Sequence, residues 1–129
     1  MRFLALSPRD NALKVIGLEN LFCCGEKAGL LVGHTEAIVT GMLAGHNAVR
    51  WIHGKELLVL PPETCIGDAI AHVKEEMKTE EGLGLKYTFS GSVYFKRMQQ
   101  LGLYTTDIQA IRDRVEKAGF TGIFAKKVC

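Results

Sequence analysis

Residues 20–50 read NLFCCGEKAGLLVGHTEAIVTGMLAGHNAVR, and this stretch decides the fold predicted for the chain. The continuous apolar run Leu21–Cys24 is typical of a strand buried on both faces. A glycine-containing loop follows over Gly25–Gly33. From His34 to about His53 the pattern is helical, and Gly54 stands where a C-terminal cap belongs. The stretch therefore predicts a strand, a loop and a helix in succession.

The loop and the helix start together resemble a ligand site. Glycines at 25, 29 and 33 let the backbone approach a ligand closely. A helix start presents unpaired N–H groups and a partial positive charge, which suit a phosphate or a ring that becomes anionic. Glu26, at the tip of the loop, can accept hydrogen bonds from the hydroxyls of a sugar-like chain. A purely structural interpretation, in which the glycines serve turns and tight packing, fits the same unit.

The predicted helix has one face that is nearly free of side chain. Ala37, Gly41, Gly45 and Ala48 recur at i, i+4, i+8 and i+11. A glycine inside a helix costs about 1 kcal/mol relative to alanine. The pattern therefore predicts a close neighbour for this face, either a sheet or another backbone.

The flanking segments complete the expected fold. Arg2–Ser7 and Leu13–Ile16, joined by a turn at Pro8–Asn11, predict an N-terminal β-hairpin. Helices are expected over 64–78, over 92–101 and from Thr106, where Gln109 completes a capping-box pattern. We expect a loop over 79–85 and a last strand over 123–125. The fold class expected is α/β of the α+β, helix-rich type, divided into residues 1–60 and a small helical domain over 61–129.

Composition narrows the classes of function. The chain has 129 residues, a net charge of +2, 47% hydrophobic residues and no apolar run of the roughly 18 residues that span a bilayer. No secretory signal is evident, so a cytoplasmic location and free thiols are expected. The cysteines and histidines have no metal-site spacing, and we expect no metal. Aromatic residues between Tyr87 and Tyr104 fit either a core or a nucleic-acid patch.

Three segments, taken together, resemble a known family. Cys24–Glu26, Gly33–Ala37 and Gly41–Arg50 resemble the C-terminal FAD motif of the glutathione-reductase-like flavoproteins. The variant is that of the glucose-inhibited division protein A (GidA) group and its folate-dependent tRNA uracil methyltransferase relatives. Pro61–Gly67 resembles the Pro-Arg-Glu-Thr-Ala-Leu-Gly segment of the same group. The resemblance covers residues from about 17 to 78.

The resemblance implies a cofactor, a set of contacts and a parent fold. The cofactor is FAD, and residues 1–60 would be the last part of a Rossmann-like FAD-binding domain. Glu26 would contact the ribityl hydroxyls, and the backbone from Gly33 to Glu36 would face the O2/N1 edge of the flavin. The residues expected to bind the cofactor are Gly25, Glu26, Gly29, Gly33, His34, Thr35 and Glu36.

A Rossmann-like FAD site also needs a GxGxxG motif for the pyrophosphate, and this sequence contains none. We therefore expect a C-terminal flavin-site fragment of a GidA-like FAD-dependent oxidoreductase, with the missing FAD-binding half supplied by more chain or by a partner chain. Alone it should be inactive and should not retain FAD. tRNA is a partner by family resemblance only. The alternative is a non-catalytic helical interaction or oligomerisation module that keeps a relict flavin motif.

Overall fold

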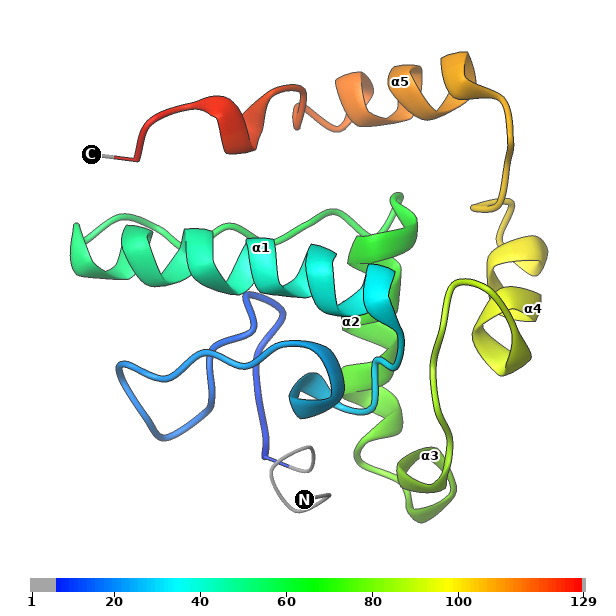
Figure 1. The fold of residues 1–129 in the computed structure, drawn as a ribbon, viewed down its shortest axis with the longest axis horizontal. Helices are drawn as coiled ribbons and strands as arrows, with labels where there is room; N and C mark the ends of the chain where they lie inside the picture. The colour runs from blue at the N-terminus through cyan, green and yellow to red at the C-terminus, as the bar shows by residue number, and fades with distance from the viewer. Residues whose placement is uncertain (1–6, 129) are drawn as a thin grey trace.

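The computed structural model describes residues 7–128 as a helix-rich chain (Figure 1). A long helix, α1, lies beside an N-terminal segment of loops and turns, and shorter helices follow. The elements are η2 (Gly25–Ala28), α1 (His34–Ile52), α2 (Cys65–Glu76), α3 (Glu80–Gly84), α4 (Ser92–Gln100), α5 (Ile108–Lys117) and η3 (Ile123–Ala125), where η marks a 3-10 helix.

The predicted β-structure is wrong, because residues 7–128 contain isolated bridges but no strand or sheet. The expected hairpin survives as single pairings, in which Ile16 N donates to the Pro8 carbonyl at 2.9 Å. Leu13 has a φ of +67°, which breaks the extended run expected of the second strand. The first expected strand falls almost wholly on residues 1–6, outside the described part of the chain.

The buried strand expected over Leu21–Cys24 is also absent. Val15 N donates to the Leu21 carbonyl and Cys23 N to the Leu13 carbonyl, both at 2.9 Å, but no ladder extends from them. A strand buried on both faces needs neighbouring strands on both edges. Residues 7–128 supply none, so this apolar run remains an extended segment.

Two smaller expectations are corrected as well. Residues 123–125 form the 3-10 turn η3 in place of a strand, because Gly122 is left-handed and accepts a hydrogen bond from Ala125 N at 3.0 Å. The loop expected over 79–85 contains α3, capped by the Thr79 hydroxyl, which accepts from Gly82 N. The cap of α5 is Asp107 and not Thr106, since the Asp107 carboxylate accepts from Gln109 N and Ala110 N.

The longer helices were predicted correctly to within a few residues. α1, α2 and α4 occupy the segments expected from their apolar periodicity and caps. At the start of α2 the Thr64 hydroxyl accepts from Gly67 N at 3.1 Å. A side chain at Gly67 would overlap the carbonyl of Pro61, so this helix start needs a glycine.

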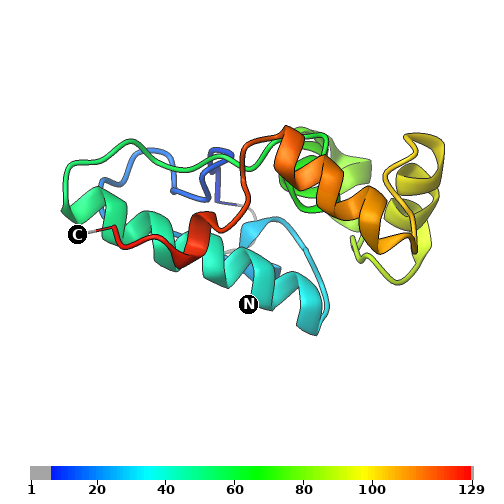
Figure 2. The same ribbon diagram turned by 90° about the horizontal axis from the view of Figure 1, so that it is seen from above.

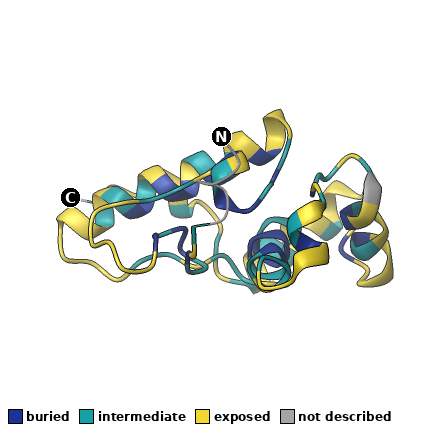
Figure 3. Cartoon of the chain, turned by 90° about the horizontal axis from the view of Figure 1, so that it is seen from below, coloured by how far each residue is buried: buried dark blue, intermediate teal, exposed yellow. Residues whose placement is uncertain are grey.

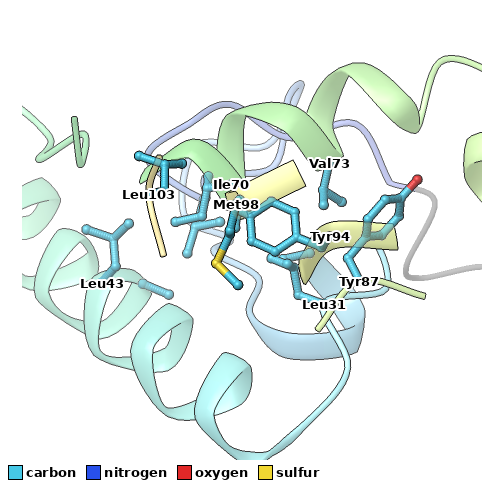
Figure 4. Packing of buried hydrophobic residues seen from close by; sticks show 12 residues of the cluster. Leu31, Leu43, Ile70, Val73, Tyr87, Tyr94, Met98 and Leu103 are labelled. Carbon is cyan, nitrogen blue, oxygen red and sulfur yellow. The ribbon is translucent and has the colours of Figure 1, made fainter. Parts of the chain in front are cut away.

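The core joins α1 to the helices that follow it (Figure 4). Leu43 of α1 and Leu31 of the preceding loop belong to the same buried cluster as Ile70 and Val73 of α2. Tyr87, Tyr94, Met98 and Leu103 complete the labelled set. The two tyrosines are nearly fully buried, so they form core and not a nucleic-acid surface.

The last part of the chain returns toward α1. α5 is followed by a segment that runs alongside α1 in both views (Figures 1 and 2). The rings of His46 and Phe124 meet edge to face at 5.2 Å, and Lys55 Nζ donates to the carbonyl of Val128. Within residues 7–128 no helix is both long and apolar enough to cross a membrane.

Candidate functional site

The glycine loop is fixed to α1 through one hydroxyl group. Thr40 Oγ1 accepts a hydrogen bond from Gly25 N at 2.8 Å and donates to the Glu36 carbonyl at 2.6 Å. Gly25 has a φ of +57°, and a Cβ there would lie 3.5 Å from Ala37 Cβ. η2 therefore packs on the first turns of α1, and the Gly25 N–H is already engaged within the chain.

The other end of η2 is held by Arg9, a residue that the sequence placed only in a turn. Its Nε and one terminal nitrogen donate to the Ala28 carbonyl at 3.0 and 2.9 Å. The other terminal nitrogen donates to the Ile70 carbonyl at 2.9 Å, which ties the loop to α2. Burial lowers the pKa of Arg9 to about 10, so the guanidinium stays charged at neutral pH.

Gly29 also has a structural role. It ends η2 in the left-handed region with a φ of +99°, and an added Cβ would overlap Met77 Sδ and crowd Val73 of α2. Gly29 is buried against that helix. Its backbone therefore faces the protein interior.

At the start of α1 the carboxylate of Glu36 turns back toward Gly33. Glu36 is only 3% exposed, and its Oε1 accepts from Phe89 N at 2.5 Å. Gly33 has a φ of +135°, and a Cβ there would overlap Glu36 Oε2. The acidic side chain thus links the helix start to the loop before α4, and it balances the partial positive charge of the first turn.

Four of the seven candidate residues remain at the surface around this helix start. Glu26, Gly33, His34 and Thr35 are exposed, whereas Gly25, Gly29 and Glu36 are buried. α1 has no side-chain cap, and the N–H groups of His34 and Thr35 donate no hydrogen bond within residues 7–128. These N–H groups and the Glu26 carboxylate are the groups that the family resemblance assigns to the ring edge and the ribityl chain of a flavin. Whether these residues hold a cofactor stays a prediction.

A small open cavity borders the loop on its N-terminal side. It has a volume of about 260 Å³, and its lining includes Val15, Phe22, Cys23, Cys24 and Lys27. Burial raises the pKa of the Cys23 thiol, whose Sγ lies 3.6 Å from the Leu13 carbonyl. Among the described cysteines 23, 24 and 65 are free. Cys23 is thus a neutral, half-buried thiol that helps to pack the loop.

The second half of the quoted stretch holds the chain together. Asn47 is fully buried, and its Nδ2 donates to the carbonyls of Ala12 and Leu58 at 3.0 and 2.8 Å. Its Oδ1 accepts from Leu58 N at 2.7 Å. Arg50 Nε donates to the Glu56 carbonyl at 2.5 Å. These residues position α1 between the N-terminal segment and the return after the helix.

Comparison with known proteins decides the relationship of this part of the chain. Residues 2–56 match the family model of glucose inhibited division protein A. Residues 2–56 are thus similar to that family, and we call them the GidA-like part. The GidA-like part includes the whole loop, all of α1 and the exposed helix start.

Curated proteins that are similar to this chain are named as tRNA methyltransferases. The chain is 40% identical over 68 residues to the methylenetetrahydrofolate–tRNA-(uracil-5-)-methyltransferase TrmFO of Caldicellulosiruptor bescii, which is 53% of this chain and 15% of that protein. It is 38% identical over 60 residues to the TrmFO of Bacillus pumilus, 46% of this chain and 14% of that protein. The chain thus spans about 15% of the length of these relatives. No solved structure matches it.

Proposed function

We propose that the GidA-like part forms one side of the flavin site in a larger FAD-dependent oxidoreductase. The observation that carries this proposal is the exposed start of α1, with its uncapped N–H groups, inside the segment that matches the family model. A helix N-terminus stabilises negative charge on a bound ring or phosphate. The structural roles of Gly25, Gly29 and Glu36 support the proposal by fixing the loop beside that helix start.

In the proposed site the chain supplies position and electrostatics. The Glu26 carboxylate accepts hydrogen bonds from ribityl hydroxyls. The backbone N–H groups of His34 and Thr35 face the ring edge that becomes negative on reduction. The flavin itself, when bound, supplies the electron and hydride chemistry.

The rest of the cofactor requires groups that this sequence does not contain. No GxGxxG motif is present to cradle the pyrophosphate. We therefore propose that the remainder of a flavin-binding domain, on more chain or on a partner chain, completes the site. Modification of tRNA is proposed for the complete protein, because the relatives carry that activity in their names.

Titration with FAD tests this function. The purified chain should show no flavin absorbance band after gel filtration. Co-expression with the C. bescii TrmFO, truncated to remove the segment similar to this chain, should yield a complex that retains flavin. Glu26→Ala should weaken flavin retention by about tenfold, as expected for the loss of charge-assisted hydrogen bonds.

Glu19→Ala is the matched control, because Glu19 is an exposed carboxylate in a turn before the loop. It should leave flavin retention unchanged. A complex that forms but holds no flavin would contradict the proposed function. Tight FAD binding by the isolated chain would contradict the need for a second half.

The alternative, a non-catalytic interaction module with a relict motif, has one observation in its favour. Large apolar side chains of α1, including Ile38 and Ile52, face solvent in this chain. Such a surface belongs to an interface in either case. The two functions differ in whether the assembled complex retains flavin, which the titration measures.

A further inference from the structure

α1 is apolar on two opposite faces. Its inner face carries Leu43 and Ala44, which belong to the core. Its outer face carries Ile38, Met42, Val49 and Ile52, which are exposed by 61%, 52%, 40% and 79%. These residues follow one another at i, i+4, i+11 and i+14, so they form a single stripe along the helix. We call these four residues and Gly45 the outer stripe.

The outer stripe has the composition of an interface. Between Ala37 and Val49 the sequence contains no Asp, Glu, Lys or Arg. A surface helix normally carries charged and polar residues on the face opposite its core. Figure 3 shows α1 with buried and exposed bands along its length, and the exposed band here is apolar.

The shape of the stripe indicates how close the occupant comes. An added Cβ at Gly45 would meet nothing within 4 Å, and one at Gly41 would meet only Cys24 Sγ at 4.0 Å. Neither glycine is required by packing within the described chain. Small residues on a helix face allow another backbone to approach to short distance, as when a helix lies across a sheet. The C-terminal segment contacts α1 at His46, which is not a member of the stripe.

The location of the stripe within the chain identifies its occupant. The whole stripe lies inside residues 2–56, the part that matches the family model. The relatives are several times longer than the matched segment, of which 68 residues are 15% of the C. bescii protein. A surface inside the matched segment is therefore expected to meet chain of the kind that those relatives contain beyond it.

We propose that the outer stripe of α1 is the surface on which the remainder of the flavin-binding domain docks, through a sheet-like, backbone-dense face. This proposal rests on the proposed function, and it names the surface through which this chain joins the remainder of the flavin-binding domain. The open side of α1 and its uncapped N-terminus belong to the same helix. Docking on the stripe thus places the incoming domain beside His34, which lies one turn before Ile38 on the same face.

A pair of matched double variants tests this surface. The chain is co-expressed with the truncated C. bescii TrmFO, and the amount of complex captured through a tag on the TrmFO part is measured. Ile38→Lys with Ile52→Lys should reduce capture by about tenfold or more, because lysines would then meet an apolar interface. Ile108→Lys with Ile111→Lys, on exposed residues of α5 outside the matched part, should leave capture unchanged.

Folding of each variant is checked by circular dichroism and thermal unfolding of the isolated chain. Both double variants should unfold at the temperature of the parent chain, since all four side chains are exposed there. Sedimentation equilibrium measures self-association in parallel. A monomeric chain supports the proposal, and a dimer abolished by the Ile38/Ile52 variant would overturn it in favour of a second copy.

The remaining outcomes are equally decisive. No capture of the parent chain by the truncated TrmFO of either C. bescii or B. pumilus would overturn the proposal. So would capture that is insensitive to the Ile38/Ile52 variant. If capture is insensitive to the Ile38/Ile52 variant but the complex retains flavin, the proposed function stands and the docking surface is contradicted. If capture depends on the stripe but the complex holds no flavin, the docking surface stands and the proposed function is contradicted.

Discussion

Gly67 and Gly45 are both glycines inside helices, yet their surroundings differ in kind. At Gly67 an added Cβ would overlap the Pro61 carbonyl and lie 2.7 Å from the Leu60 carbonyl oxygen. At Gly45 the same atom would meet nothing within 4 Å. The first glycine is explained by packing inside the chain. The second glycine lowers the stability of the helix, and no close contact within residues 7–128 requires it.

The contrast between these glycines gives a paired prediction. Gly67→Ala should lower the free energy of unfolding by about 2 kcal/mol or more, because the backbone around Pro61 must move. Gly45→Ala should raise it by up to about 1 kcal/mol through helix propensity. Denaturation in urea measures both. Equal effects of the two substitutions would contradict the crowding at Gly67.

The buried Tyr87 hydroxyl should make the free energy of unfolding fall at high pH. Burial raises its pKa from 10.0 to about 12, and its hydroxyl donates to the Gly82 carbonyl at 3.1 Å. The unfolded chain loses this proton near pH 10, whereas the folded chain keeps it to about pH 12. The contribution is therefore fully present below pH 10 and is lost as pH rises from 10 to 12.

Tyr87→Phe should flatten the fall in unfolding free energy over this interval. Burial, and then the nearby Asp68 carboxylate, also raise the pKa of Tyr94, so part of the fall should remain in the variant. Tyr104→Phe serves as the control because its ring is half exposed. An unchanged slope in Tyr87→Phe would show that this hydroxyl ionises equally in both states.

At the scale of elements, Asn47 joins three segments through α1. Its amide bonds the Ala12 carbonyl, the Leu58 carbonyl and the Leu58 N–H. The N-terminal loops and the return after α1 have no sheet to hold them within the described chain. Their position relative to the helix depends on this side chain and on Arg9.

Replacing Asn47 should therefore loosen both segments. Asn47→Ala leaves buried backbone groups without partners and should lower the free energy of unfolding by about 3 kcal/mol. Amide exchange at Leu58 should rise more than exchange within α2. Asn20→Ala, at an exposed position, should change stability by less than about 0.5 kcal/mol. Unaltered amide exchange at Leu58 would show that the hydrogen bonds of Asn47 do not hold the segment after α1 in place.

The helices could be predicted from sequence because their signals are local. The start of α2 follows from its cap at Thr64, and the end of α1 follows from Gly54, which has a left-handed φ of +62°. The strands failed because an apolar run such as Leu21–Cys24 becomes a strand only with partners, which local patterns do not supply. The cap of α5 was misplaced by one residue, since Asp107 and Thr106 are both good caps.

The glycine loop and the start of α1 were predictable from sequence, but the contacts made by their side chains were not. Glycine spacing located the loop and the helix start, and the exposed Glu26 and His34 lie there. No local pattern indicates that Glu36 turns inward to accept from Phe89 N, 53 residues away. Arg9 carried no motif at all. Its importance depends on the carbonyls of Ala28 and Ile70, which only the folded chain brings together.

At the scale of the whole molecule, side-chain burial decreases from α1 and α2 toward α5. The core draws its members from residues 13–103, and α5 contributes no buried residue. α5 is held mainly by Arg114, which donates to the carbonyls of Leu103 and Gly102 at 2.9 and 3.0 Å. Ile108 and Ile111 remain exposed. Arg114 thus joins α5 to the preceding segment by side-chain hydrogen bonds, and no side chain of α5 is fully buried.

This difference predicts two levels of local stability. Amide hydrogens of α5 should exchange at least about tenfold faster than those in the middle of α1 and α2, because local opening of α5 exposes little apolar surface. Arg114→Ala should widen the gap by removing the contacts to Leu103 and Gly102. Arg112→Ala, an exposed neighbour on the same helix, is the control and should leave exchange unchanged. Protection of α5 equal to that of α1 would mean that the C-terminal segment belongs to the same cooperative unit as the core.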